Sequence, residues 1–194
     1  MRICALNFKG GCGRTTLSLQ LAAFYAKQRQ RTLLHDRDPQ GSALAWAALA
    51  EETPFSVGSS RSPGFQVEIV DTAPRMPVNG VVPQADLYVI PTLLDAVSFV
   101  VFLHTLAFVQ ERRLPHVIVA NRVNERRAEH RARLTTPELS GALVVRERAA
   151  YSASYDLGQS VFDLPGRWAG DAQAEIGRIA SAIHGLTTMG RVAA

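Results

Sequence analysis

The chain has little lysine, little cysteine and no long apolar run. Of the 21 basic residues among its 194, only Lys9 and Lys27 are lysines, so a lysine within a glycine-rich loop does not reflect background abundance. Cys4 and Cys12 are the only cysteines, too far apart for a C-x-x-C pair and too few for a disulfide framework. We therefore expect a reduced protein with two small buried or loop thiols.

Two further absences concern the membrane. No apolar run approaches the roughly 20 residues that a membrane-spanning helix requires, and Met1 to Asn7 lacks the apolar stretch of a signal peptide. The segment from Gly185 to Ala194 is small and polar, unlike a basic amphipathic membrane anchor. We expect a soluble, cytoplasmic protein without a membrane partner, in which residues 1–194 form a single domain.

The composition that is present fits an ordinary globular protein, with 47% hydrophobic and 20% charged residues. The net charge is +4 and the isoelectric point is about 9.5. This balance permits contact with nucleic acid but does not require it.

Short apolar runs alternate with helical stretches along the whole chain. Strands are expected at 2–7, 32–35, 67–70, 87–90, 117–120 and 143–145, and helices at 15–30, 43–50, 95–111 and from Gly170-Asp171 onward. Residues 51–64 are rich in Ser, Gly and Pro and are expected to form a surface connection. Continuous Val/Ile/Leu strands separated by helices predict a doubly wound α/β fold, with a mostly parallel sheet and helices on both faces.

A glycine-rich loop follows the first expected strand and leads into a helix that opens with Thr15-Thr16. Glycines allow the backbone to approach phosphate, and the helix N-terminus presents free N–H groups. A hydroxyl at the helix start is a ligand for Mg²⁺, and Thr15 is assigned to that role. The sequence therefore predicts a phosphate-binding loop for a nucleotide.

The segment Lys9-Gly10-Gly11-Cys12-Gly13-Arg14-Thr15-Thr16 resembles the deviant Walker A box of the ParA/MinD family of P-loop ATPases. The resemblance implies that ATP and Mg²⁺ are the cofactors and that Lys9 reaches the phosphates of a partner subunit in an ATP-dependent homodimer. It is closest to the small ParA-like partition ATPases. The nucleotide-binding residues implied are Lys9, Gly10, Gly11, Cys12, Gly13, Arg14, Thr15, Thr16 and Asn121.

The sequence departs from the family pattern at Arg14, where the family has lysine. A guanidinium is larger, planar and more directional than an ammonium, so the exchange is not conservative at a phosphate. We predict that nucleotide binding survives and that hydrolysis, with Lys9, Arg14 and Asp38 as catalytic residues, is slow or absent.

Three further motifs follow strand ends in the family order. Asp36-Arg37-Asp38-Pro39-Gln40-Gly41 resembles switch I, which implies that Asp38 orients the attacking water and Asp36 supports the Mg²⁺ shell. Asp71-Thr72-Ala73-Pro74 resembles the Walker B and switch II segment, with Asp71 on the metal. Asn121-Arg122 resembles the purine site, where Asn121 either pairs with the adenine edge or has another role. Asp95 is equally compatible with a helix N-cap and a functional group.

Arginines are concentrated in the C-terminal half, beginning with the run from Arg122 to Arg133. The resemblance implies non-specific DNA binding through such residues and a centromere-binding adaptor protein as partner, in partition of a plasmid or mobile element. A salt-bridged, solvated helix face is the alternative for the arginines. A nucleotide-dependent scaffold that positions a protein or conjugation complex is the alternative function.

Overall fold

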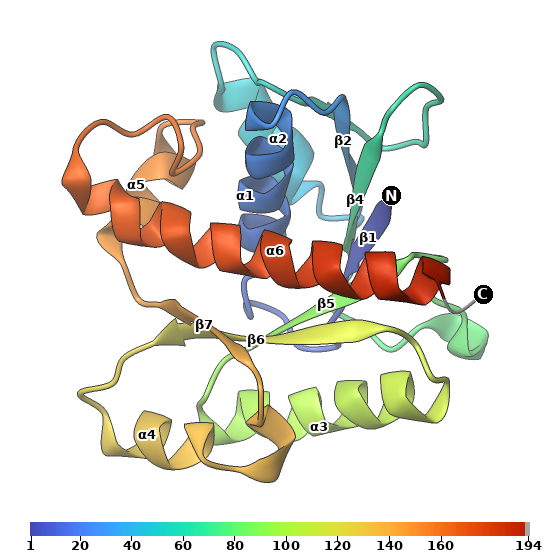
Figure 1. Ribbon diagram of the computed structural model, residues 1–194, viewed down its shortest axis with the longest axis vertical. Helices are drawn as coiled ribbons and strands as arrows, with labels where there is room; N and C mark the ends of the chain where they lie inside the picture. Colours follow the sequence, from blue (N-terminus) through green and yellow to red (C-terminus); the bar gives the residue numbers. More distant parts are fainter. Residues whose placement is uncertain (193–194) are drawn as a thin grey trace.

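The computed structural model describes residues 1–192 and is built on a seven-stranded parallel sheet (Figure 1). The strands are β1 (Arg2–Ala5), β2 (Thr32–Arg37), β3 (Ser56–Gly58), β4 (Val67–Thr72), β5 (Leu87–Thr92), β6 (His116–Val123) and β7 (Leu143–Arg146). Their order across the sheet is β3-β2-β4-β1-β5-β6-β7, and every neighbouring pair is parallel. The glycine-rich loop therefore leaves the central strand.

Within residues 1–192, six α-helices cover the two faces of the sheet. They are α1 (Arg14–Lys27), α2 (Ser42–Leu49), α3 (Ala96–Glu111), α4 (Ala128–Leu134), α5 (Ala149–Asp156) and α6 (Gly170–Val192). In Figure 1, α1 and α6 lie on the side of the sheet opposite to α3 and α4. The doubly wound α/β fold predicted from the alternating pattern is confirmed.

Neighbouring residues on each strand supply two separate hydrophobic cores, because successive strand side chains point to opposite faces. Ile69 of β4 packs in the core that includes Leu21 of α1 and Ile176 of α6. Val70, the next residue, packs in the core that includes Phe102 of α3. All six residues of β4 and of β5 are buried, as expected for a sheet covered on both sides.

The structure extends several strands beyond the apolar runs that predicted them, among them β2 and β4. β2 continues through Asp36 and β4 through Asp71, and the parallel register places these two residues directly opposite each other. Two carboxylates are thereby brought together at the carboxyl edge of the sheet, where ligands bind in open α/β folds.

The expected surface connection at 51–64 contains the short edge strand β3. It pairs with β2, and Phe55 just before it stacks on Trp46 with ring centroids 5.8 Å apart. This aromatic stack anchors the segment, which the Ser, Gly and Pro content did not reveal. Within residues 1–192, the structure contains no helix both long and apolar enough to cross a membrane.

Candidate nucleotide site

The loop between β1 and α1 has the backbone shape that its glycines predict. Gly11 and Gly13 have φ angles of 75° and 92°, a region that favours glycine. At Gly13 a Cβ atom would lie 2.1 Å from Nδ2 of Asn121, so a side chain cannot be accommodated there. The amides at the start of α1 follow directly from this turn, as phosphate binding requires.

Thr15 and Asp71 meet at the base of this loop. The Thr15 hydroxyl donates a hydrogen bond to Oδ2 of Asp71 over 2.6 Å, and Ser18 approaches the other carboxylate oxygen at 3.4 Å. Burial raises the pKa of Asp71 to about 6; the Thr15 hydrogen bond and the charge of Arg14 lower it, and Asp36 and Asp38 raise it. Hydroxyl and carboxylate oxygens of this kind suit Mg²⁺, which commonly binds one or two carboxylates together with substrate phosphates.

Asp36 is buried and holds the switch I segment through the backbone. One carboxylate oxygen accepts the amide of Asp38 at 3.0 Å, and the other accepts those of Ala43 and Leu44 at 3.0 and 3.1 Å. Because the N-cap residue of α2 is Gly41, which has no side chain, Asp36 supplies the acceptor for the first turn of the helix.

Asp38 lines a cavity beside the glycine loop and has an oxygen free for other contacts. Its Oδ1 accepts the amide of Gln40 at 3.0 Å, and it is half-buried rather than enclosed. The structure thus brings Asp36, Asp38 and Asp71 to one edge of the sheet, as the motifs predicted. Their roles toward metal and water stay predictions.

The two cationic side chains of the loop differ in how firmly they are held: Lys9 makes few contacts, whereas Arg14 is buried and hydrogen-bonded. The Lys9 ammonium makes one long contact, 3.4 Å to the carbonyl of Gly10, and the residue is half-buried. Arg14 is 6% exposed, and its guanidinium donates to the carbonyls of Asn7, Lys9 and Thr72. The cation that replaces the family lysine is therefore directed into the loop and the adjoining strand.

Asn121 braces the glycine loop. Its Nδ2 donates to the carbonyl of Cys12 over 2.8 Å, and its Oδ1 accepts the amide of Arg122 at 3.0 Å. It is 5% exposed and lies at an irregularity of β6, where Arg122 has a φ of 52°. Pairing with an adenine stays a prediction. Asp95, by contrast, is the N-cap of α3, since its side chain accepts the amide of Ser98.

The cavity that joins these parts has a volume of about 610 Å³. Its far wall comes from the end of β7 and from α5, which the sequence motifs did not identify; these residues include Arg148, Tyr151 and Tyr155. Burial raises the pKa of Tyr155, and the charges of Asp71 and Asp36 raise it further. Helix α5 carries no sequence motif, so its contribution to the cavity wall is seen only from its position beside α1 in the structure.

The sheet, the glycine loop and the carboxylates define a P-loop nucleotide-binding domain. The family model described as the CobQ/CobB/MinD/ParA nucleotide binding domain matches residues 3–161, and the chain belongs to this family. The membership expected from the glycine loop and the switch motifs is thereby confirmed.

Relatives within the family differ in the cargo for which they are named. The chain is 32% identical to maintenance of carboxysome distribution protein A of Gloeobacter kilaueensis, over 92% of this chain and 91% of that protein. Its fold resembles that of McdA from Cyanothece in complex with ATP, with a TM-score of 0.71, 13% identity and coverage of 95% and 96%. It also resembles a plasmid partition protein of Borrelia burgdorferi, with a TM-score of 0.62, 16% identity and coverage of 81% and 95%.

Proposed function

We propose that this chain is a partition-type ATPase that binds ATP with Mg²⁺, dimerises face to face around the nucleotide, and in that state binds DNA without sequence preference. The observation that carries the proposal is the 2.6 Å contact between Thr15 and Asp71 at the base of the glycine loop. A hydroxyl and a carboxylate joined in this way are suited to a magnesium site whose other ligands are nucleotide phosphates and water.

Magnesium at this position would be held by Thr15 directly and by Asp71 directly or through water. The ion would neutralise charge on the phosphates and draw electron density from the bond to be broken. Asp38, with a carboxylate oxygen free at the mouth of the cavity, is suited to orient the attacking water. Asp36 supports the same step by holding the Asp38 backbone.

Dimerisation is supported by the position of Lys9. The residue is half-buried, and its ammonium makes only one long, exposed contact within the loop, so it is available to a phosphate presented by a second copy of the chain. Lysine is a compact point charge on a flexible stem, which suits such a reach.

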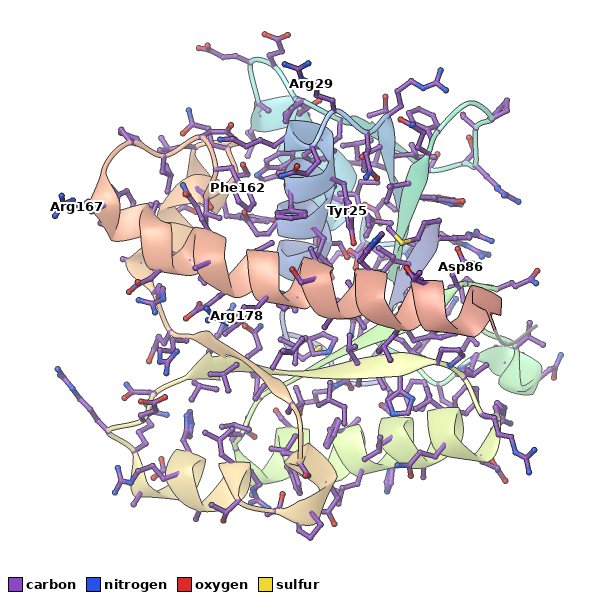
Figure 2. The ribbon with its side chains drawn as sticks, in the orientation of Figure 1. Tyr25, Arg29, Asp86, Phe162, Arg167 and Arg178 are labelled. Atoms are coloured by element: carbon purple, nitrogen blue, oxygen red, sulfur yellow. The ribbon has the colours of Figure 1, made fainter. Side chains whose placement is uncertain are left out.

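DNA binding is supported by exposed arginines that lack acidic partners among residues 1–192. Arg146 and Arg148 pair with acidic residues, and Arg133 stacks over the ring of Phe99 at 4.2 Å. Arg167 points outward from the turn before α6, and Arg178 lies on α6 itself (Figure 2). Within residues 122–188, the exposed arginines without an ion pair are Arg122, Arg126, Arg127, Arg131, Arg167 and Arg178. Charges of this kind neutralise phosphates without reading bases.

For the cargo we propose DNA, a plasmid or mobile element tethered through a centromere-binding adaptor. A protein cargo is the second candidate, favoured by the near-full-length similarity to a carboxysome distribution protein. The buried guanidinium of Arg14 also suits a slowly hydrolysing, nucleotide-dependent scaffold.

The proposal is tested by light scattering with ATP, ADP or no nucleotide, in the presence of Mg²⁺. A dimer is expected with ATP alone, and Lys9→Gln should lose it, whereas the matched variant of the other lysine, Lys27→Gln, should retain it. An ATP-bound monomer at high protein concentration would contradict the sandwich dimer.

DNA binding is measured on the same samples at several salt concentrations. The double variant Arg126→Ala/Arg127→Ala should weaken binding equally for unrelated sequences, and the salt slope should fall by about 0.9 for each phosphate that is no longer neutralised. Arg31→Ala is the control, because Arg31 is exposed and directly precedes β2, which lies on the other side of the central strand from β6. The double variant removes two charges and the control removes one, so equal weakening per charge removed would show that only net charge matters.

A further inference from the structure

The guanidinium of Arg14 lies against the protein's own backbone. Its Nη1 donates to the carbonyls of Asn7 at 2.7 Å and Lys9 at 2.6 Å, and its Nε donates to the carbonyl of Thr72 at 2.9 Å. Nη1 also lies 3.6 Å from the sulfur of Cys12. Two of the carbonyls belong to the phosphate loop and one to the end of β4, so a single side chain joins the two segments.

The chemistry of the three acceptors explains why arginine suits this position. Each is a strong acceptor at or near the protein interior, and a carbonyl that loses its donor there is costly. Guanidinium has five N–H groups in a fixed fork and can serve carbonyls on two different segments at once. Lysine offers three donors from one atom and cannot span the same set.

The contact to Thr72 runs beside the metal-binding pair. Arg14 bonds to Thr72 while the next residue, Thr15, bonds to Asp71, which precedes Thr72. The hydroxyl of Thr72 also donates to the carbonyl of Ala5 at the end of β1, over 2.7 Å. The start of α1, the end of β1 and the end of β4 are therefore tied into one unit, on which the geometry of the magnesium ligands depends.

We propose that Arg14 is a positioning residue: it clamps the phosphate loop to the end of β4 and so fixes Thr15 against Asp71, while Lys9 is the lysine that meets the phosphates. This inference rests on the proposed function, because it concerns the ATP–Mg²⁺ site. In this inference, Arg14 holds two backbone segments together, whereas a cation that binds phosphate would contact the nucleotide.

The experiment separates binding of phosphate from placement of the metal. Calorimetry measures the dissociation constant of ATP in EDTA and again in excess Mg²⁺, for the unaltered chain and for Arg14→Gln. If Arg14 is a clamp, the dissociation constant of ATP in EDTA should differ by no more than about threefold between the two proteins. The factor by which Mg²⁺ tightens ATP binding should be at least tenfold smaller in Arg14→Gln. A phosphate-binding cation predicts at least tenfold weaker binding in EDTA, which would overturn the inference.

Hydrogen exchange of the nucleotide-free protein gives a second readout. Arg14→Gln should speed amide exchange in both 8–13 and 72–75, because the clamp joins these segments. Exchange that speeds in the loop alone would contradict the tie to β4.

Arg14→Lys provides the test if Arg14→Gln does not fold. Faster exchange at 72–75 together with tighter ATP binding in EDTA is the expected result, since lysine leaves the carbonyls and can reach phosphate. Unchanged exchange and an unchanged EDTA value would overturn the clamp. If the unaltered chain binds no ATP under either condition, the proposed function itself fails, and exchange at 72–75 still decides whether the clamp exists.

Discussion

The buried carboxyl of Asp71 should make the nucleotide-free protein less stable than a variant with an uncharged side chain at this position. Asp71 has no exposed surface, and burial raises its pKa to about 6 from an ordinary value of 3.8. At about 1.4 kcal/mol per pKa unit, holding the ionised form in the folded protein costs about 3 kcal/mol above pH 6. Asp71→Asn removes the charge and leaves an oxygen that can still accept from Thr15.

The expected gain at pH 8 is about 1–2 kcal/mol, because the new amide group must also find a partner. For a chain of this size that raises Tm by about 3–6 °C. The folded pKa lies above the unfolded one, so the native carboxyl takes up its proton first as pH falls, and the cost of Asp71 fades from pH 6 toward pH 4. At pH 5 the cost of the charge has fallen to about half, whereas the cost of the new amide group does not change with pH, so the gain should fall to about zero there.

Calorimetric melts of Asp71→Asn and the unaltered chain at pH 8 and pH 5, without nucleotide, check this reasoning. Asp38→Asn is the control, because Asp38 is half-buried and accepts only the amide of Gln40; its Tm should change by less than about 2 °C. The same Asp71→Asn protein should lose the strengthening of ATP binding by Mg²⁺. A Tm that falls at pH 8, or a gain of equal size at both pH values, refutes the argument.

Three further substitutions follow from the site. Asp36→Ala leaves three backbone amides without their acceptor and should lower the free energy of unfolding by about 1–3 kcal/mol. The loss should appear as a lower Tm and as faster amide hydrogen exchange in α2. A Tm within about 1 °C of the unaltered chain would contradict the capping role. Gly13→Ala combines a φ of 92° with a 2.1 Å clash against Asn121, so ATP binding should fall at least tenfold in calorimetry, whereas Gly185→Ala on α6 should leave it unchanged. Arg14→Lys should raise ATP turnover. If the unaltered chain already turns over ATP at a near-normal rate, and Arg14→Lys raises that rate by no more than about twofold, this would falsify the prediction that arginine slows the reaction.

The parts of the site that depend on strand ends were predictable from sequence. In a parallel sheet the carboxyl ends meet at one edge, so Thr15 and Asp71, which follow β1 and end β4, had to approach each other. The alternating apolar runs likewise predicted the doubly wound fold. The lengths of β2 and β4 were underestimated because Asp36 and Asp71 are polar, although their backbone continues the ladder.

Other features depend on contacts between distant segments, which no local pattern encodes. The direction of the Arg14 side chain is set by the carbonyl of Thr72, 58 residues away. Asn121 turns toward the loop because Gly13 leaves room for its amide. Tyr155 enters the site only because α5 packs beside α1, where Gln20 bonds to Ser154.

The different positions of Arg14 and Lys9 should link ATP binding to dimerisation. If Arg14 stays on the backbone carbonyls, a single copy of the chain meets the phosphates with loop amides and Mg²⁺ but without a lysine or arginine of its own at the usual position. Neutralisation of the γ-phosphate then depends on Lys9 of a second copy, so ATP binding and dimerisation become more tightly linked than they are with lysine at position 14. The affinity for ATP should accordingly rise with protein concentration while the affinity for ADP does not. In Arg14→Lys the concentration dependence should weaken, because each copy then carries its own phosphate-binding lysine.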